Sequence, residues 1–112
     1  MLIGMRRRLL AVLLFVAAAA RAADAPVLPA GRYSVVLRGM LCKVCARAIA
    51  AEWAKLPEVE KSSVDYDKET GVVAIRLDRT LQVSSLRRAL RRAERVANLG
   101  ARFELRDIQY IP

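Results

Sequence analysis

Hydrophobic and polar residues alternate along four short stretches of the chain and follow a helical spacing along two longer ones. Alternation predicts strands, because successive side chains of a strand point to opposite faces, and apolar residues three or four positions apart predict amphipathic helices. The expected strands cover residues 32–38, 59–66, 72–77 and 101–108. The expected helices cover residues 43–55 and 84–98. The elements therefore follow the order strand, helix, strand, strand, helix, strand.

This order is typical of the ferredoxin-like βαββαβ fold of α+β proteins, in which two helices cover one face of a four-stranded antiparallel sheet. The side chains expected to point inward are Tyr33, Val35, Leu37, Ile49, Trp53, Leu56, Val64, Tyr66, Leu86, Leu90, Ala93, Phe103, Leu105 and Asp107. Gly71 is expected in the turn between the second and third strands, where glycine adopts a positive φ. Ser84 or Ser85 is expected to cap the second helix, and Asn98 or Gly100 to end it.

The first 22 residues have the pattern of a secretory signal peptide. Three arginines, Arg6 to Arg8, precede a charge-free apolar run over residues 9–20 that is shorter than the ~20 residues needed to cross a membrane. Ala20-Arg21-Ala22 then matches the A-x-A pattern that precedes a cleavage site. Cleavage after Ala22 predicts export and a periplasmic mature protein, with an uncleaved N-terminal anchor as the alternative.

Cleavage would divide the chain into a signal peptide (1–22), an extended leader (23–31) and one folded domain (32–112). It would also lower the net charge. The whole chain of 112 residues has 20 Lys and Arg against 11 Asp and Glu, which is a formal charge of +9. Four of these arginines lie in the predicted signal peptide, so the mature chain would carry +5.

Five arginines of the second expected helix supply much of the remaining positive charge, namely Arg87, Arg88, Arg91, Arg92 and Arg95. They lie opposite the apolar stripe, so they predict either a solvated helix face or a surface that docks onto an acidic partner. Nucleic-acid binding is disfavoured, because the strand positions that stack on bases in RNA-binding modules hold Val36 and Ala74 instead of aromatic residues. Contact with a membrane is expected only through a partner.

The two cysteines of the chain, Cys42 and Cys45, form a C-x-x-C motif where a loop enters the first expected helix. Unpaired N–H groups and the positive end of the helix dipole favour negative charge there, and Lys43 adds positive charge. Two thiolates at this spacing suit a soft ion such as Cu(I), and a chain without histidine offers such an ion few other ligands. The absence of histidine also excludes a Ser-His-Asp triad, and we expect no enzymatic activity.

Other interpretations of the C-x-x-C motif differ in chemistry. An exported protein favours a structural disulfide, and a redox dithiol like that of thioredoxin has the same spacing. Leu41 stands where thioredoxin-like domains usually carry tryptophan, and a zinc site needs four Cys or His ligands where this chain has two. The alternative that we retain is a periplasmic thiol-disulfide or structural interaction protein with an oxidised Cys42–Cys45 pair.

Gly39, Met40, Cys42 and Cys45 match G-M-x-C-x-x-C, the signature of heavy-metal-associated domains, a family that the chain resembles from Tyr33 to Ile108. Shorter motifs of this family are matched by Leu56-Pro57-Glu58-Val59, Val64-Asp65-Tyr66 and Val83-Ser84-Ser85-Leu86. Such domains occur in copper chaperones and metal-pumping ATPases. With its predicted signal peptide, the chain is most similar in layout to the periplasmic mercury-binding proteins of mercury-resistance systems.

The resemblance implies a non-enzymatic carrier that binds Cu(I) or Hg(II) through Cys42 and Cys45. It implies that the carrier passes the ion to a metal transporter or a metal-pumping ATPase. Cys42, on the loop, would meet the incoming ion first, and Cys45, in the first turn of the helix, would complete the pair. Met40 is expected to pack into the core beneath the loop instead of binding the ion.

The chain departs from the family pattern after the second helix. The family carries a glycine–aromatic pair there that packs beside the metal loop, and counting from Leu86 places this pair on Glu94 and Arg95. A glycine appears only later, at Gly100. We therefore expect a longer second helix or a rebuilt loop, with Arg95 or Ala101 near the metal loop.

Overall fold

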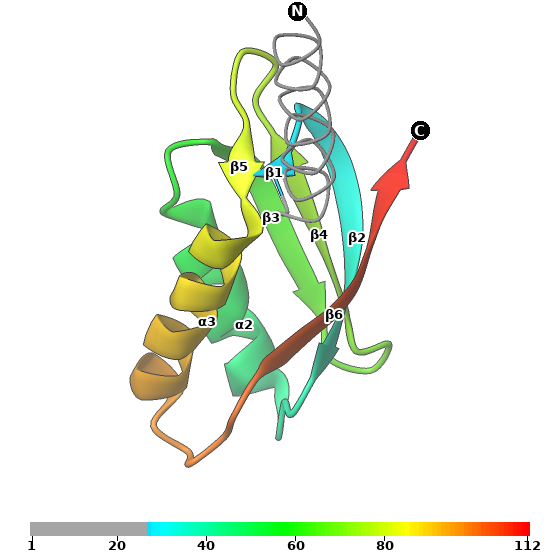
Figure 1. The fold of residues 1–112 in the computed structure, drawn as a ribbon. Coiled ribbons are helices and arrows are strands. Elements are labelled where there is room, and N and C mark those ends of the chain that lie inside the picture. The colour runs from blue at the N-terminus through cyan, green and yellow to red at the C-terminus, as the bar shows by residue number, and fades with distance from the viewer. Residues whose placement is uncertain (1–26) are drawn as a thin grey trace, which may run out of the picture.

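The expected elements appear in the expected order along the chain, which the computed structural model describes over residues 27–112 (Figure 1). With two short strands added, the observed elements are β1 (Val27–Leu28), β2 (Gly31–Arg38), α2 (Lys43–Ala54), β3 (Val59–Asp65), β4 (Thr70–Ile75), β5 (Leu81–Gln82), α3 (Val83–Ala97) and β6 (Glu104–Ile111). The predicted signal peptide, residues 1–22, lies outside the described residues. Within residues 27–112, neither helix combines the length and apolar character needed to cross a membrane.

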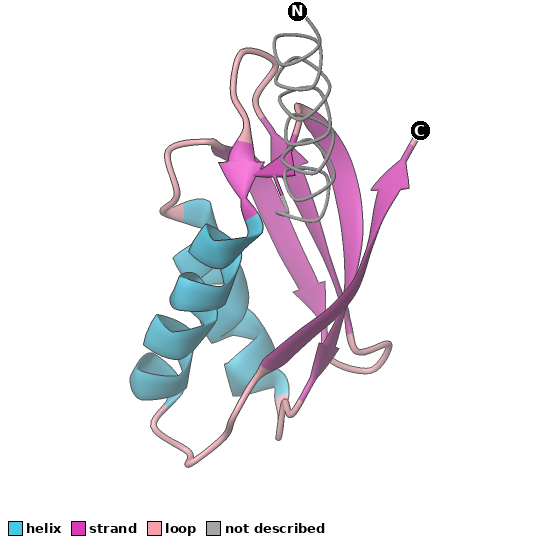
Figure 2. Ribbon diagram, in the orientation of Figure 1, coloured by secondary structure: helices cyan, strands magenta, loops and turns pink. Residues whose placement is uncertain are grey.

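Four strands form one antiparallel sheet in the order β3-β4-β2-β6, and both helices lie on the same face of it (Figure 2). This arrangement confirms the ferredoxin-like α+β fold. A second, shorter pairing joins β1 to β5, with Val27 opposite Gln82 and Leu28 opposite Leu81. The hydrophobic pattern does not predict these two strands, because two residues are too few to show an alternation.

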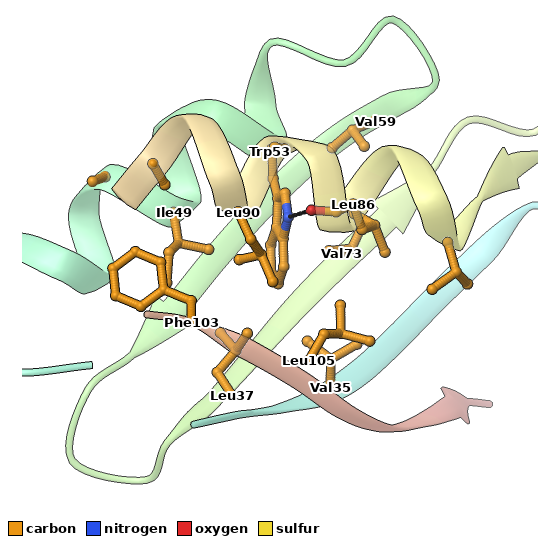
Figure 3. Packing of buried hydrophobic residues seen from close by; sticks show 14 of the residues in the cluster. Val35, Leu37, Ile49, Trp53, Val59, Val73, Leu86, Leu90, Phe103 and Leu105 are labelled. Carbon is orange, nitrogen blue, oxygen red and sulfur yellow. Dashed lines mark hydrogen bonds between the residues drawn. The ribbon is translucent and has the colours of Figure 1, made fainter. Parts of the chain in front are cut away.

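The core lies between the sheet and the two helices, and Trp53 is its largest fully buried side chain (Figure 3). The indole N–H of Trp53 donates a hydrogen bond of 3.2 Å to the carbonyl oxygen of Leu86, which joins α2 to α3 through a buried contact. The predicted inward residues that are buried are Tyr33, Val35, Leu37, Ile49, Trp53, Leu86, Leu90, Ala93, Phe103 and Leu105. Leu56 and Val64 are partly buried against this cluster.

Gly71 lies in β4 and not in the preceding turn, which corrects its predicted role. A Cβ on Gly71 would lie 2.8 Å from Cζ3 of Trp53 and 3.3 Å from Cδ1 of Leu37. The position therefore suits glycine because the indole ring occupies the space of a side chain. The positive φ of the turn belongs to Glu69, at 53°.

Asp107 is exposed, which contradicts the predicted alternation of the last strand. The register between β2 and β6 shifts between Ser34 and Val36, and Asp107 has a φ of 43°. Such a bulge adds one residue to a strand and so reverses which of the following side chains point inward. Ile108 packs against the core in place of Asp107.

The second helix begins earlier than expected, because it follows β5 directly. Its N-cap is Gln82 instead of Ser84 or Ser85, and no side chain caps the helix. The hydroxyl of Ser84 donates instead to Oε1 of Gln82 at 3.3 Å. The predicted end is confirmed, since Asn98 is the C-cap in a left-handed conformation, with a φ of 51°.

Glu52 is the charged residue that is buried within the described part of the chain. Its carboxylate accepts hydrogen bonds from Nζ of Lys55 at 2.9 Å and from Nε of Arg92 at 3.3 Å, so it links α2 to α3. The Lys55 hydrogen bond lowers the pKa of Glu52 below its ordinary value of 4.5. Burial opposes this shift of the pKa, and Arg92 adds to it.

Candidate metal site

Gly39 turns the chain from β2 into the loop over residues 39–42, the metal loop, which leads to Cys42 and then into α2 with Cys45. Its φ is +95°, a conformation that other residues rarely adopt. A Cβ at this position would lie only 1.8 Å from the carbonyl oxygen of Arg102. Both the backbone conformation and the missing space therefore require glycine here. The first residue of the G-M-x-C-x-x-C motif thus lets the loop lie directly against the segment that precedes β6.

The structure brings Cys42 and Cys45 together at the start of α2. Cys42 is the N-cap of the helix, in an extended conformation, and its carbonyl oxygen accepts the N–H of Cys45 at 3.1 Å. Cys42 is half-buried, whereas Cys45 is fully buried as part of the core cluster. Both are free cysteines. The candidate site therefore has one thiol at the surface and one below it.

The residues that flank Cys42 in the sequence include two exposed apolar side chains. Leu41, just before Cys42, is 57% exposed, and Val44, two residues after it, is 44% exposed. Met40 is partly buried against the core, which agrees with the structural role expected for it. Lys43, the first residue of α2, is exposed. Next to Cys42 in the sequence, the chain thus exposes two apolar side chains and one positive charge.

Tyr66 connects this loop to the β3–β4 hairpin. It was expected to point into the core, but it is only partly buried, and its hydroxyl donates a hydrogen bond of 3.1 Å to the carbonyl oxygen of Leu41. A second contact with this hairpin is the ion pair of 3.2 Å between Arg38, the last residue of β2, and Glu69. The alternating pattern of β3 could not reveal the Tyr66 contact, because it joins residues from two different elements.

The segment between α3 and β6 forms the other wall of the loop. The atoms closest to a Cβ on Gly39 belong to Arg102 and Phe103, and not to the residues expected there. Arg95 is exposed and lines a groove over Glu52, while Ala101 is buried in the core. The Cα of Phe103 lies 3.5 Å from that Cβ on Gly39, and its side chain, 1% exposed, belongs to the core cluster that also contains Cys45. The sequence predicted that Phe103 points inward but not that it lies beside this loop, because it stands well beyond the position expected for the glycine–aromatic pair.

Carboxylates do not extend the cysteine pair into a larger site. Within residues 27–112, no group of three or more Cys, Asp or Glu side chains converges on one point. The arrangement therefore offers an ion two sulfur ligands. Two ligands suit an ion that accepts near-linear coordination, whereas tetrahedral Zn²⁺ would need further ligands.

Comparisons with known proteins point to one family of domains. The model of the heavy-metal-associated domain family matches residues 35–95, which is more than half of the chain. The N-terminal domain of ZntA in its Zn(II) form is similar, with 27% identity and a TM-score of 0.54 over 72% of this chain and 96% of that one. The N-terminal domain of PacS from Synechocystis PCC6803 has 26% identity and a TM-score of 0.51, over 71% and 98% of the two chains.

A third solved structure shares the fold. It is the N-terminal domain of a potential copper-translocating P-type ATPase from Bacillus subtilis in the Cu(I)-loaded state. Its identity to this chain is 24% and its TM-score is 0.54, over 71% of this chain and 91% of that one. No curated protein matches the chain.

Proposed function

The chain belongs to the heavy-metal-associated domain family, and from this premise we propose that it binds a soft metal ion through Cys42 and Cys45 and passes it to a partner protein. The observation that carries the proposal is the position of the two free thiols at the start of α2, one half-buried and one beneath it. Domains of this family bind and transfer metal ions, and the role proposed here is non-enzymatic.

Capture of the ion proceeds in two steps. Cys42 meets the ion first, because its side chain is the more accessible of the two. Cys45 is fully buried, so the loop between Gly39 and Cys42 has to open before its sulfur can bind. Each thiol releases a proton as it binds, so uptake of one ion by both thiols releases two protons. The unpaired N–H groups at the start of α2 favour the resulting negative charge.

Cu(I) and Hg(II) are the ions that this site suits best. Both are soft ions that are content with two sulfur ligands, and the chain has no histidine to complete a larger coordination sphere. Among the similar structures, the Bacillus subtilis ATPase domain is in a Cu(I)-loaded state and the ZntA domain is in a Zn(II) form. Two thiolates leave tetrahedral Zn²⁺ with open positions, so we place Zn²⁺ behind the two soft ions.

The partner that we propose is a metal transporter or a metal-pumping ATPase. Support comes from the likeness to a P-type ATPase domain in fold, and from the exposed Leu41 and Val44 beside Cys42, which offer an apolar contact surface. Transfer takes place through intermediates in which thiolates of both proteins share the ion. The arginines of α3 suit an acidic surface on that partner.

Export to the periplasm is part of the proposal and is supported by residues 1–22 alone.

An oxidising compartment such as the periplasm also favours a second candidate function, in which Cys42 and Cys45 form a disulfide in a thiol-disulfide or structural interaction protein. The reduction potential of the pair separates the two. A pair that stays reduced at the periplasmic poise agrees with metal binding, whereas a stable disulfide there favours the second candidate.

The decisive experiment is a titration of the purified, reduced chain with Cu(I), and separately with Hg(II), against a competing chelator. We expect one ion per chain and loss of that binding in the Cys42→Ser, Cys45→Ser double variant. Val44→Ser is the matched control, because it changes the same turn of α2 without removing a thiol. Equal uptake by the double variant and the unmodified chain would contradict the proposal.

A further inference from the structure

Two side chains of α3 hold the backbone of Phe103 from both sides. The carboxylate of Glu94 accepts the N–H of Phe103 at 2.7 Å, and the guanidinium of Arg91 donates to the carbonyl oxygen of Phe103 at 2.9 Å. Arg91 and Glu94 also pair with each other at 2.5 Å. The three residues therefore form a closed set of hydrogen bonds, which we call the Phe103 clamp.

The carboxylate of the clamp is sheltered, and its guanidinium is partly exposed. The side chain of Glu94 is 15% exposed, so water competes little for its carboxylate, whereas the side chain of Arg91 is 47% exposed. Hydrogen bonds to charged groups are about twice as strong as neutral ones, and partial burial strengthens them further. Ordinary surface pairs, by contrast, contribute little. The clamp is thus suited to hold the segment before β6 in one position.

That position is directly against the metal loop. The carbonyl oxygen of Arg102 and the Cα of Phe103 face Gly39, three residues before Cys42. The ring of Phe103 belongs to the same core cluster as Cys45 and lies beside Ile49 in Figure 3. Movement of this segment would release Gly39 and open the core cluster that covers Cys45.

We propose that Arg91 and Glu94 are positioning residues of the metal site, which hold Phe103 and Arg102 against Gly39 and so keep Cys45 buried until the loop opens. The inference rests on the proposed function. It also accounts for the departure from the family pattern. Glu94 stands where the glycine–aromatic pair is expected, and its carboxylate holds the backbone of Phe103, an aromatic residue nine positions later in the chain.

Glu52 provides a matched control for the test. Like Glu94, it is a sheltered glutamate that pairs with an arginine of α3, and Arg92 stands next to Arg91 in the sequence. Glu52, however, holds α2 to α3 and not the segment beside Gly39. Glu94→Gln and Glu52→Gln therefore remove the same charge from similar surroundings, and only the first weakens the clamp.

The experiment measures the alkylation rate of Cys45 by iodoacetamide in the full chain carrying Cys42→Ser, with each glutamine variant added in turn. Urea unfolding gives the global stability of each protein, and mixing the Cu(I)-loaded protein with a chelator gives its rate of Cu(I) transfer with Cys42 restored. We expect Glu94→Gln to raise the alkylation rate about tenfold over Glu52→Gln, as expected for a weakened charged hydrogen bond at a local opening. We also expect Glu94→Gln to raise the rate of Cu(I) transfer to the chelator severalfold, at a global stability similar to that of Glu52→Gln.

Equal alkylation rates for the two variants at similar stability would overturn the proposal. If Glu94→Gln fails to fold, Arg91→Lys supplies the same test, because it keeps the charge and loses the forked contact with both Glu94 and Phe103. A chain that fails to bind Cu(I) or Hg(II) but shows the alkylation difference would contradict the proposed function and support the clamp. A chain that binds the ion with no such difference would overturn the clamp alone.

Discussion

The two ends of α2 are built from different kinds of contact. At its start, Cys42 is half-buried, Leu41 and Val44 are exposed, and Tyr66 donates a hydrogen bond to the carbonyl oxygen of Leu41. At its end, Trp53 is fully buried with its N–H bonded, and Glu52 has both carboxylate oxygens paired. Local opening requires the least energy where buried contacts are fewest. We therefore expect the start of α2 to open more easily than its end, as the proposed capture of an ion by Cys45 requires.

Replacing Trp53 by alanine removes buried packing at the end of α2 and has the largest expected effect. It removes the largest buried side chain and its bond to Leu86, and we expect a loss of about 3–5 kcal/mol in the free energy of unfolding. That is a large part of the 5–15 kcal/mol typical of small domains. Urea unfolding followed by circular dichroism measures it. Leu77→Ala is the control, because Leu77 is 95% exposed, and similar losses for both would contradict the packing.

Gly39→Ala breaks the other end. The new methyl group would meet the Arg102 carbonyl oxygen in a backbone conformation that alanine avoids, and we expect a loss of about 2–4 kcal/mol together with weaker Cu(I) binding. Gly100→Ala separates the two causes. Gly100 also has a positive φ, of +73°, but its Cβ would meet nothing within 4 Å. A loss in the Gly39 variant no greater than in the Gly100 variant would show that the close approach is unimportant.

The contribution of Glu52 to stability depends on pH. Its pKa is lowered in the folded protein, chiefly by the Lys55 hydrogen bond, from an ordinary value of 4.5 that the unfolded chain retains. The unfolded state therefore binds the proton first as pH falls, so the stabilisation is complete above about pH 5 and is lost as pH falls through the folded pKa. We expect the difference in free energy of unfolding between the unmodified chain and Glu52→Gln to shrink between pH 5 and pH 3.

Glu104→Gln serves as the control for this titration. Glu104 pairs with Arg106 at 3.2 Å in an exposed position, so its contribution should be small at every pH. A Glu52 contribution that stays constant from pH 7 to pH 3 would contradict the lowered pKa.

Tyr66→Phe tests the tether of the metal loop and has the smallest expected effect. It removes the hydrogen bond to the Leu41 carbonyl oxygen, which is worth about 0.5–1.5 kcal/mol. We expect transfer of Cu(I) to a chelator to become faster by severalfold, with little change in global stability. Tyr110→Phe removes a hydroxyl from the exposed end of β6 and should leave the transfer rate unchanged. Equal rates for both variants would show that Tyr66 does not restrain the loop.

Local patterns determined the two helices, the four strands of the larger sheet, the order of these elements and most of the core. The alternation in β2 and the helical spacing of Ile49 and Trp53 are properties of neighbouring residues, so they are legible without a structure. The same holds for the cysteine motif at the start of α2. The family followed from these local features, and the matched family model confirms it. Export and the identity of the ion stay predictions.

Tertiary structure decided what depends on contacts between distant segments. The Trp53 ring occupies the space that a side chain at position 71 would need. The bulge beside Asp107 depends on the pairing of β6 with β2. The hydroxyl of Tyr66 is hydrogen-bonded to the carbonyl oxygen of Leu41. The aromatic wall of the metal loop comes from Phe103, held by Glu94 of α3. No local pattern encodes such contacts, because the partners come close only when the sheet and helices have packed. The chain by itself thus determined which thiols are present, and the fold decided which of them is covered and what covers it.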